Sequence, residues 1–427
     1  MCIIFIFLLL GSCGMGSDGT KTARDAVSED AAPLAASLPG EGGDAAKEAS
    51  VPDRKGPEIK IRVNLSPEEE DAMQMLAEDF NASNGQGIRV VVQNEPEQEQ
   101  EETDTTADIL LGDVETVRKT KGLQSLNERY AAEYGNDPDV PQSLRLASEV
   151  GGERFGVPFD LDGGVFFYNA SLYEEYELAP PATWDALLQV GEVLMEEEFC
   201  PVMVTDSLTD LADLLLRQKG VSLTEGTRAA FAGEAGEAVF TFLLSMLNDD
   251  YLLLADKGTC QEKFLEGSCA GYIGNGSELS GMFRSTTFTV GAVPVPYPED
   301  SETVCAPCTM RVLALYHGEK DVQDAAWEFV RYLTTPSVSA RWAVATGHFP
   351  VRGAAYLEPE YVDYMETSVA ANASTGARYG YYMPQSYSED LQYRVREIIG
   401  RNMKSNVTGE EIAQILLQEV NDSLAAN

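Results

Sequence analysis

Apolar and polar residues follow a strand, helix, strand pattern at the start of the folded part of the chain. They alternate through residues 59–63, which is the period of a half-buried strand. Ser66 then begins a stretch of helical spacing, and Glu69 completes a capping box with it. Apolar runs at 88–92 and 107–111 predict two more strands. Strands joined by a helix within about 35 residues are typical of a parallel α/β sheet.

Helical and strand patterns keep alternating through the rest of the chain. Helical spacing dominates residues 183–254, and strands are predicted at 270–273, 289–293 and 310–316. The folded part, residues 58–427, exceeds what one hydrophobic core usually supports, so we expect two lobes. No later apolar run is long enough to predict a membrane span.

The first ten residues are almost wholly apolar and run into Leu-Gly-Ser-Cys, which resembles a bacterial lipoprotein cleavage box ending at Cys13. An apolar run this short does not span a bilayer and is typical of a secretion signal. We therefore expect residues 1–12 to be removed and Cys13 to carry a lipid anchor. Residues 13–57 are rich in Ala, Gly, Ser and acidic side chains, which predicts a disordered tether.

The chain carries 70 acidic against 30 basic residues, a formal net charge of −40 at pH 7. Most of this excess lies beyond residue 57. Such a charge argues against nucleic acid or an anionic surface as a partner. It does not identify a ligand, because a small molecule senses only the cleft that holds it.

Motifs of the common enzyme classes are missing from the sequence. It has two histidines, and no His-Glu-x-x-His metal motif, Gly-x-Ser-x-Gly elbow or Walker loop. We therefore expect a binding protein with no catalytic residue, no metal and no cofactor. A glycosidase with paired carboxylates is the enzyme class that the composition still permits.

Five cysteines lie in the folded part, and an oxidising compartment would permit disulfides between them. The nearest in sequence are Cys260 with Cys269 and Cys305 with Cys308, which leaves Cys200 over. Spacing does not determine connectivity, so the pairing stays open.

One segment carries a family resemblance. Residues 155–169 read Phe-Gly-Val-Pro-Phe-Asp-Leu-Asp-Gly-Gly-Val-Phe-Phe-Tyr-Asn, and Thr-Trp follows at 183–184. This arrangement resembles the signature of the family 1 extracellular solute-binding proteins of ABC importers. Further blocks fall in the family's order at 107–111, 264–267, 335–342 and 346–351. The collinear resemblance covers residues 58–427.

The resemblance implies an α/β, periplasmic-binding-protein-like type II fold, in which two α/β lobes hold a ligand cleft between them and close by hinge bending. Maltose-binding proteins have this architecture. By position, the N-terminal lobe would comprise 58–165 and 310–350, and the C-terminal lobe 166–309 and 351–427. The chain would cross between the lobes near 163–169, 305–310 and 349–353.

The resemblance also implies a function. The protein would capture a small polar nutrient, a sugar or polyol, and deliver it to the permease subunits of an ABC importer. Its lipid anchor would hold it on a membrane, facing the periplasm or the cell exterior. Glycerol-3-phosphate or a glycerophosphodiester is the alternative ligand, because residues 376–380 resemble a Gly-x-Arg-x-Gly block whose Arg, here Arg378, contacts phosphate. Pro307 and His348 depart from that subfamily's pattern, so the sugar interpretation comes first.

Nine residues are candidate ligand contacts. Carboxylates that follow strands can accept hydrogen bonds from polyol hydroxyls, and tyrosine rings can stack on a sugar. Ser277 and Arg378 occupy positions that the resemblance assigns to phosphate contacts. The candidates are Asp113, Asp160, Asp162, Asn275, Ser277, His348, Arg378, Tyr379 and Tyr381.

Overall fold

The computed structural model describes most of the chain beyond the predicted tether. The described ranges are 56–95, 107–135, 137–282, 285–299, 305–377 and 380–426. They all belong to the unit that spans residues 53–427. The predicted signal peptide, Cys13 and nearly all of the tether lie outside the described residues, as do Arg378 and Tyr379.

Eleven strands form one sheet in the part of the chain that the structure describes. They are β1 (Glu58–Val63), β2 (Arg89–Asn94), β3 (Ile109–Asp113), β6 (Gly156–Asn169), β7 (Met203–Thr205), β10 (Leu252–Leu254), β11 (Gly271–Asn275), β12 (Val290–Pro294), β13 (Ala306–Leu315), β14 (Phe349–Pro350) and β15 (Tyr381–Tyr382). Their order is β10-β7-β11-β6-β13-β3-β1-β2, with β12 and β14 also paired with β6, and β15 with β13. Two short hairpins stand apart, β4 (Glu149–Val150) with β5 (Glu153–Arg154), and β8 (Thr224–Glu225) with β9 (Arg228–Ala229).

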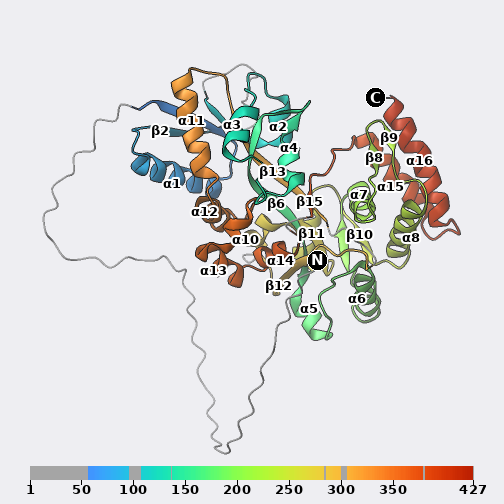
Figure 1. Ribbon diagram of the computed structural model, residues 1–427. Helices are drawn as coiled ribbons and strands as arrows, with labels where there is room; N and C mark the ends of the chain where they lie inside the picture. The colour runs from blue at the N-terminus through green and yellow to red at the C-terminus, as the bar shows by residue number, and fades with distance from the viewer. Residues whose placement is uncertain are drawn as a thin grey trace, which may run out of the picture. The chain divides into compact units, whose positions relative to one another are not determined.

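The helices connect these strands and pack beside them (Figure 1). Their bounds are α1 (Pro67–Ser83), α2 (Val114–Lys119), α3 (Asn127–Glu133), α4 (Gln142–Ala147), α5 (Ala170–Glu175), α6 (Trp184–Glu197), α7 (Leu208–Gln218), α8 (Glu234–Asn248), α9 (Cys260–Leu265), η2 (Gly276–Glu278), α10 (Leu279–Met282), α11 (Lys320–Leu333), α12 (Pro336–Thr346), η3 (Gly353–Leu357), α13 (Pro359–Thr367), α14 (Val369–Ala377), α15 (Glu389–Asn402) and α16 (Gly409–Ala426). The predicted opening unit is confirmed as β1-α1-β2, with β1 parallel to both β2 and β3. The predicted capping box of Ser66 and Glu69 at α1 is confirmed as well.

Two long strands, β6 and β13, connect the two sides of the sheet. β13 pairs with β3 over its last five residues, so β3, β1 and β2 form what we call the β3 side. The second part of β6 pairs with β11 and β12, so β11, β7 and β10 form the β11 side. β6 and β13 pair with each other from Gly156 to Gly163. The sheet is therefore continuous, and both sides depend on the same antiparallel pair.

Each side of the sheet packs against its own helices. On the β3 side, Ile59, Met73, Leu313 and Phe329 are buried in a core that α1 and α11 share with the strands. On the β11 side, a larger core includes Phe240 of α8 and residues of α15 and α16. Helices α8 and α16 lie side by side there (Figure 1). The sheet and its helices form an α/β fold, as the sequence predicts.

Two short strands, β14 and β15, pair with β6 and β13 near the point where these two long strands meet. In β14, Phe349 and Pro350 pair with Leu161 and Asp160 of β6, and β15 pairs with the first residues of β13. The segments 305–310 and 349–353, which the sequence predicts as crossings, thus both adjoin β6. The exact lobe boundaries predicted from the sequence stay a prediction.

The structure also bears on the expected disulfides and on the expected lack of a membrane span. Cys200, Cys260, Cys269, Cys305 and Cys308 are all free in this structure. Neither pairing suggested by nearness in sequence is therefore formed. Among the described helices, none combines the length and the apolar character needed to cross a bilayer.

Close packing of Gly163 in β6 generates a first prediction. A Cβ built at Gly163 would lie 2.5 Å from ring carbons of Tyr381. Overpacking of this kind typically costs about 1–3 kcal/mol, so Gly163→Ala should lower the free energy of unfolding by that amount in urea denaturation. The matched control is Gly281→Ala, since a Cβ at Gly281 meets nothing within 4 Å. Equal stability of the two variants would contradict the close packing of the crossing strands.

Candidate functional site

A cleft of about 1300 Å³ lies along the meeting point of β6 and β13. The β3 side contributes the start of α2, and the β11 side contributes the end of β7, the first turns of α7, and Lys257. Asp160, Asp162 and His348 line it from the crossing strands, together with residues 307–311. Residues 382–387 complete the lining. The volume exceeds that of most sites for drug-sized ligands, so it leaves room for a solute of several rings and for water.

Two of the candidate residues, Asp113 and Asp160, lie in one row across the sheet with Arg311, which the sequence analysis did not select. In β13, Arg311 is the register partner of Asp113 in β3 and of Asp160 in β6. A β-bulge between Arg311 and Val312 interrupts the pairing with β6 at this point. Bulges re-aim side chains. The row brings together residues that are far apart in the sequence at the floor of the cleft.

Asp160 is the most buried member of this row, with 1% of its surface exposed. Its carboxylate accepts from Nε of Arg311 at 3.1 Å and from Nε1 of Trp342 at 2.6 Å. Burial alone would raise the pKa of Asp160, but Arg311, together with His348, outweighs it and holds the pKa below the usual value. Asp160 therefore stays ionised as the partner of Arg311.

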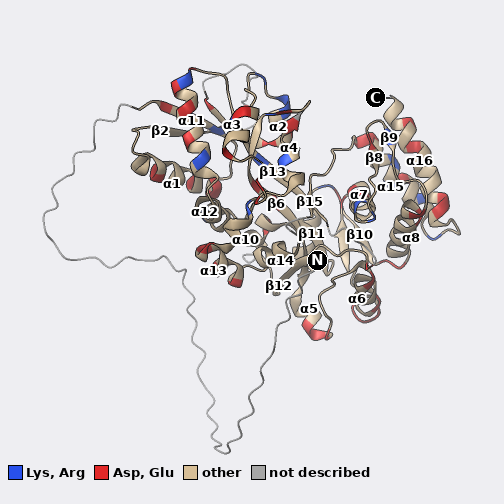
Figure 2. Ribbon diagram, viewed as in Figure 1, with Lys and Arg blue, Asp and Glu red and all other residues tan. Residues whose placement is uncertain are grey.

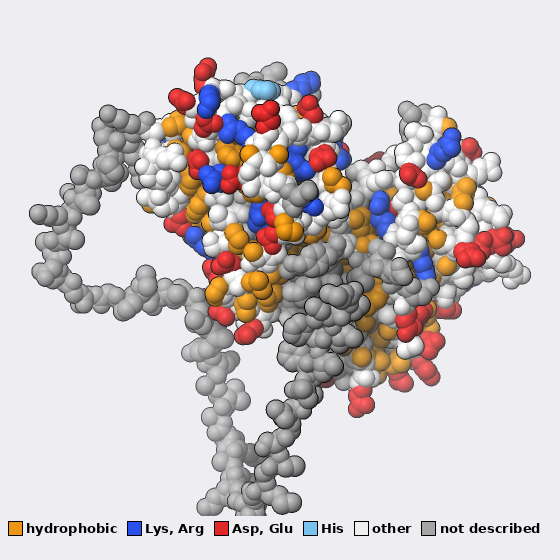
Figure 3. All heavy atoms as spheres, in the orientation of Figure 1, with side chains coloured by type: hydrophobic (Ala, Val, Ile, Leu, Met, Phe, Trp, Pro, Cys, Tyr) orange, Lys and Arg blue, Asp and Glu red, His pale blue; other side chains and the backbone are white. Residues whose placement is uncertain are grey.

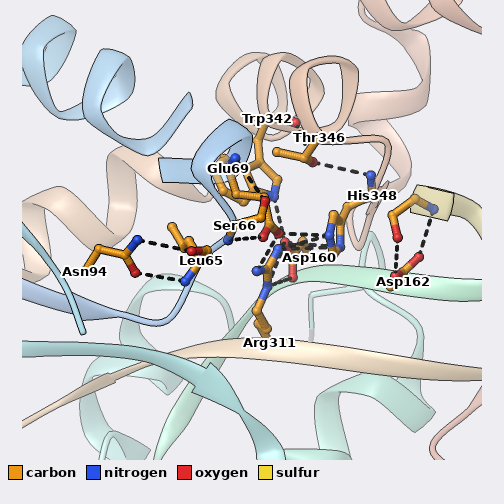
Figure 4. A network of polar contacts seen from close by, with 11 residues as sticks. Leu65, Ser66, Glu69, Asn94, Asp160, Asp162, Arg311, Trp342, Thr346 and His348 are labelled. Carbon is orange, nitrogen blue, oxygen red and sulfur yellow. Dashed lines mark hydrogen bonds and ion pairs between the residues drawn. The ribbon is translucent and has the colours of Figure 1, made fainter. Parts of the chain in front are cut away.

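Glu69 of α1 joins the same cluster, and sequence reasoning gave it only a capping role. Its Oε1 lies 2.7 Å from a terminal nitrogen of Arg311 and 3.1 Å from Nε2 of His348. Figure 4 shows Glu69, Asp160, Arg311 and His348 converging from different elements. Burial disfavours the charged form of Glu69, but the hydrogen bond from His348 and the charge of Arg311 lower its pKa overall.

Asp162 lines the cleft two residues farther along β6 and faces η2. It accepts from the backbone N–H of Ser277 at 3.1 Å and from the Ser277 hydroxyl at 2.6 Å. Burial raises the pKa of Asp162. The donors of Ser277, which the sequence interpretation left free for a phosphate, are thus occupied by a carboxylate of the chain itself.

The other candidates take varied positions. Asn275 donates its backbone N–H to Glu278 in a capping box, and neither Asn275 nor Ser277 lines the cleft. Asp113 lines the cleft while capping α2, where it accepts from Thr116. Tyr381 is buried against Phe349 and does not line the cleft, whereas the adjacent Tyr382 does. Ligand contact by these residues, and by Arg378 and Tyr379 outside the described residues, stays a prediction.

Acidic side chains outnumber basic ones in the described lining of the cleft. Seven carboxyl side chains of Asp and Glu line it, against three Lys or Arg side chains. They are Asp113, Glu115, Asp160, Asp162, Asp206, Asp210 and Asp213, against Arg118, Lys257 and Arg311. Acidic positions are also spread over helices of both sides of the sheet (Figure 2). On the face seen in Figure 3, charged side chains of both signs lie among apolar ones.

Asp206 is the main residue of the cleft lining that sequence reasoning missed. Asp206 directly follows β7, as Asp113 ends β3, so the rule that ligand groups gather at the carboxyl ends of strands predicts both. Asp206 accepts the backbone N–H of Gly258 at 2.6 Å. No group of three or more His, Cys, Asp or Glu among the described residues is arranged to hold a metal ion.

Comparison with known proteins gives a family match over most of the folded part. Residues 54–368 match the family described as bacterial extracellular solute-binding protein. The sn-glycerol-3-phosphate-binding periplasmic protein UgpB of Yersinia enterocolitica is 23% identical over 291 residues, which is 62% of this chain and 64% of that protein. The UgpB of Yersinia pseudotuberculosis is 23% identical over 184 residues, 41% of this chain and 42% of that protein. The chain thus matches less than two thirds of either relative.

Solved structures with the same architecture match most of the chain. The cyclic α-maltosyl-1,6-maltose binding protein of Arthrobacter globiformis has a TM-score of 0.74 at 20% identity, and covers 87% of this chain and 100% of its own. The UgpB of Mycobacterium tuberculosis in complex with glycerophosphocholine has a TM-score of 0.66 at 16% identity, over 87% and 99%. At such identities these likenesses show the fold alone, a type II periplasmic-binding-protein fold with two α/β lobes.

The row at the cleft floor generates a second prediction. Arg311→Met leaves Asp160 and Glu69 buried without their guanidinium partner, and removal of one member of a buried ion pair typically costs about 3–5 kcal/mol. Chemical denaturation should show that loss. The matched control is Arg331→Met, because Arg331 pairs with Glu133 and Glu328 at the surface and such pairs contribute at most about 1 kcal/mol. If both variants lost the same small amount, Arg311 would not be the centre of the cluster.

Proposed function

Because the chain belongs to the bacterial extracellular solute-binding protein family, we propose that its cleft captures a neutral, hydroxyl-rich solute for delivery to the permease subunits of an ABC importer. A sugar or polyol is the ligand class that fits. The observation that carries this proposal is the surplus of acidic side chains in the cleft, seven Asp or Glu against three Lys or Arg and one His among the described residues. Carboxylates accept hydrogen bonds from hydroxyls but repel anions.

Two of these carboxylates stand on opposite sides of the cleft. Asp113 caps α2 on the β3 side, and Asp206 follows β7 on the β11 side. An ionised carboxylate can accept about four hydrogen bonds. Asp113 and Asp206 use one or two of these positions within the chain, so each can still accept a hydrogen bond from a solute. Hydroxyls of one solute that reached both residues would link the two lobes. This arrangement supports closure around a polyol.

Tyr382 offers a flat apolar surface for the same solute. The Arg217 guanidinium lies 4.6 Å from its ring centroid, and Nε of Arg217 donates to Asp213 at 2.7 Å. Tyr382 also lines the cleft and is held by the pairing of β15 with β13. A ring fixed in this way loses little conformational freedom when a sugar stacks on it. We therefore propose Tyr382, rather than the buried Tyr381, as the tyrosine that stacks on the solute.

Glycerol-3-phosphate or a glycerophosphodiester is the second candidate. The names of the matched UgpB relatives favour it, as does the predicted contact of Arg378 with phosphate. Against it stand the acidic lining and the occupation of the Ser277 donors by Asp162. We place the neutral solute first. The proposal includes no turnover, so hydrolysis of glycosides by the purified protein would contradict it.

Calorimetric titration tests the ligand class. Neutral mono- and oligosaccharides should bind more tightly than glycerol-3-phosphate and glycerophosphocholine. Tyr382→Ala should weaken saccharide binding roughly 10- to 100-fold, which corresponds to about 1.4–2.8 kcal/mol for a lost aromatic anchor. Tyr393→Ala, an exposed position on α15, is the control and should leave the affinity unchanged. Preferential binding of the phosphate esters would favour the second candidate instead.

A lipid anchor on Cys13 is part of the proposed localisation outside the cytoplasmic membrane. The family is extracellular, and the Leu-Gly-Ser-Cys box supports the anchor. Cys13→Ser should move the protein from the membrane fraction to the soluble extracytoplasmic fraction, because several acyl chains are needed for firm attachment. Cys200→Ser is the control and should stay with the membrane. Retention of the Cys13 variant in the membrane fraction would rule out this anchor.

A further inference from the structure

His348 lies in the cleft lining, where three elements meet. It follows the end of α12 and precedes β14. Its Nε2 is 3.1 Å from Oε1 of Glu69 in α1, and its Nδ1 is 3.6 Å from Oδ2 of Asp160 in β6. A terminal nitrogen of Arg311 in β13 lies 3.3 Å from the ring. Figure 4 shows the ring between these groups.

The groups around the His348 imidazole carry more negative than positive charge. Glu69 of α1, Asp160 and Asp162 of β6, and Arg311 of β13 are the charged groups that face it. Without a charge on His348, the carboxylates of Glu69 and Asp160 share one guanidinium, and the carboxyl group of Asp162, whose pKa burial raises, lies close by. Among the described residues, the other printed contacts of this cluster add no cation, since α12 contributes Trp342 and Thr346, and η2 contributes Ser277 with Glu278 close to Asp162. An uncompensated buried charge is costly, so the cluster favours an imidazolium.

We propose that His348 is a positioning residue of the cleft, and that only its protonated form holds the first turn of α1 against β6 and β13. The imidazolium donates toward Glu69 and lies beside Asp160, so it joins the helix that carries Glu69 to the strand that carries Asp160 and Asp162. Loss of the proton turns these contacts into repulsion among carboxylates. The floor of the cleft is then ordered at acidic pH and loosens as the pH rises.

The direction of the pKa shift agrees with this geometry. Burial alone would lower the pKa of His348, but Asp160 and the hydrogen bond with Glu69 raise it above the usual 6.5 overall. A histidine with a raised pKa in the folded state stabilises the fold fully below the pKa of the unfolded state. That stabilisation is lost as the pH rises through the folded pKa.

Nuclear magnetic resonance of the histidine rings tests the proposal without a ligand, so its outcome is separate from that of the proposed function. The chain has two histidines, and His317→Gln identifies the signal of His348. The His348 signal should titrate with a midpoint above 6.5, and Glu69→Gln should move that midpoint down. A midpoint at or below 6.5 in the unmodified protein would overturn the proposal.

Hydrogen exchange and thermal unfolding supply a second readout. Amides of β6 and of the first turn of α1 should lose protection in the unmodified protein as the pH passes the His348 midpoint. After correction for intrinsic exchange, His348→Gln should lack that step, while His317→Gln should keep it. The unfolding temperature should follow the same pattern. If the loss of protection with rising pH persisted in His348→Gln, or were missing from the unmodified protein, the proton on His348 would not hold α1 in place and the proposal would be overturned.

Discussion

The ion pair between Arg311 and Asp160 is the interaction on which the cleft depends. It joins the two strands that connect the β3 side of the sheet to the β11 side, next to the bulge at which Phe159 of β6 has no register partner in β13. Trp342 from α12 and Glu69 from α1 bind the same two residues, so the helices of the β3 side are tied to this point. Buried charges require such partners, because an unpaired charge in the interior is costly. The pair therefore fixes where β6 turns from one side of the sheet to the other.

This constraint also shapes the chemistry that the cleft offers. Arg311 already serves Asp160 and Glu69, so its charge is largely neutralised within the chain. In the remaining described lining, with Asp113 and Asp206 on opposite sides, acidic side chains outnumber the cations Arg118 and Lys257. Hydroxyl groups fit such a surface, whereas phosphate would meet like charges. This electrostatic argument, rather than the fold, is the ground on which we propose a sugar or polyol before a glycerol phosphate.

Local patterns predicted the opening β1-α1-β2 unit and several later strands, but they did not identify β6, β7 or β10 as strands, and they predicted less of the site. Ser66 and Glu69 could be read as a capping box because the motif spans four residues, but the contact of Glu69 with His348 joins positions 279 residues apart along the chain. The strand-end rule selected Asp113. Sequence alone did not decide which of Tyr381 and Tyr382 lines the cleft, because neighbouring residues of a strand point to opposite faces and the register of β15 is set by its partner strand. The family resemblance supplied the architecture that no local pattern contains.

Native mass spectrometry with a competing library tests the central claim most directly. The purified chain would be mixed with neutral oligosaccharides, free polyols, glycerol-3-phosphate and glycerophosphodiesters at equal concentrations. The account predicts one adduct per chain with the mass of a neutral saccharide or polyol, and its loss in Tyr382→Ala. An adduct with a phosphate ester in preference to every neutral compound, or no adduct with any member of the library, would contradict it.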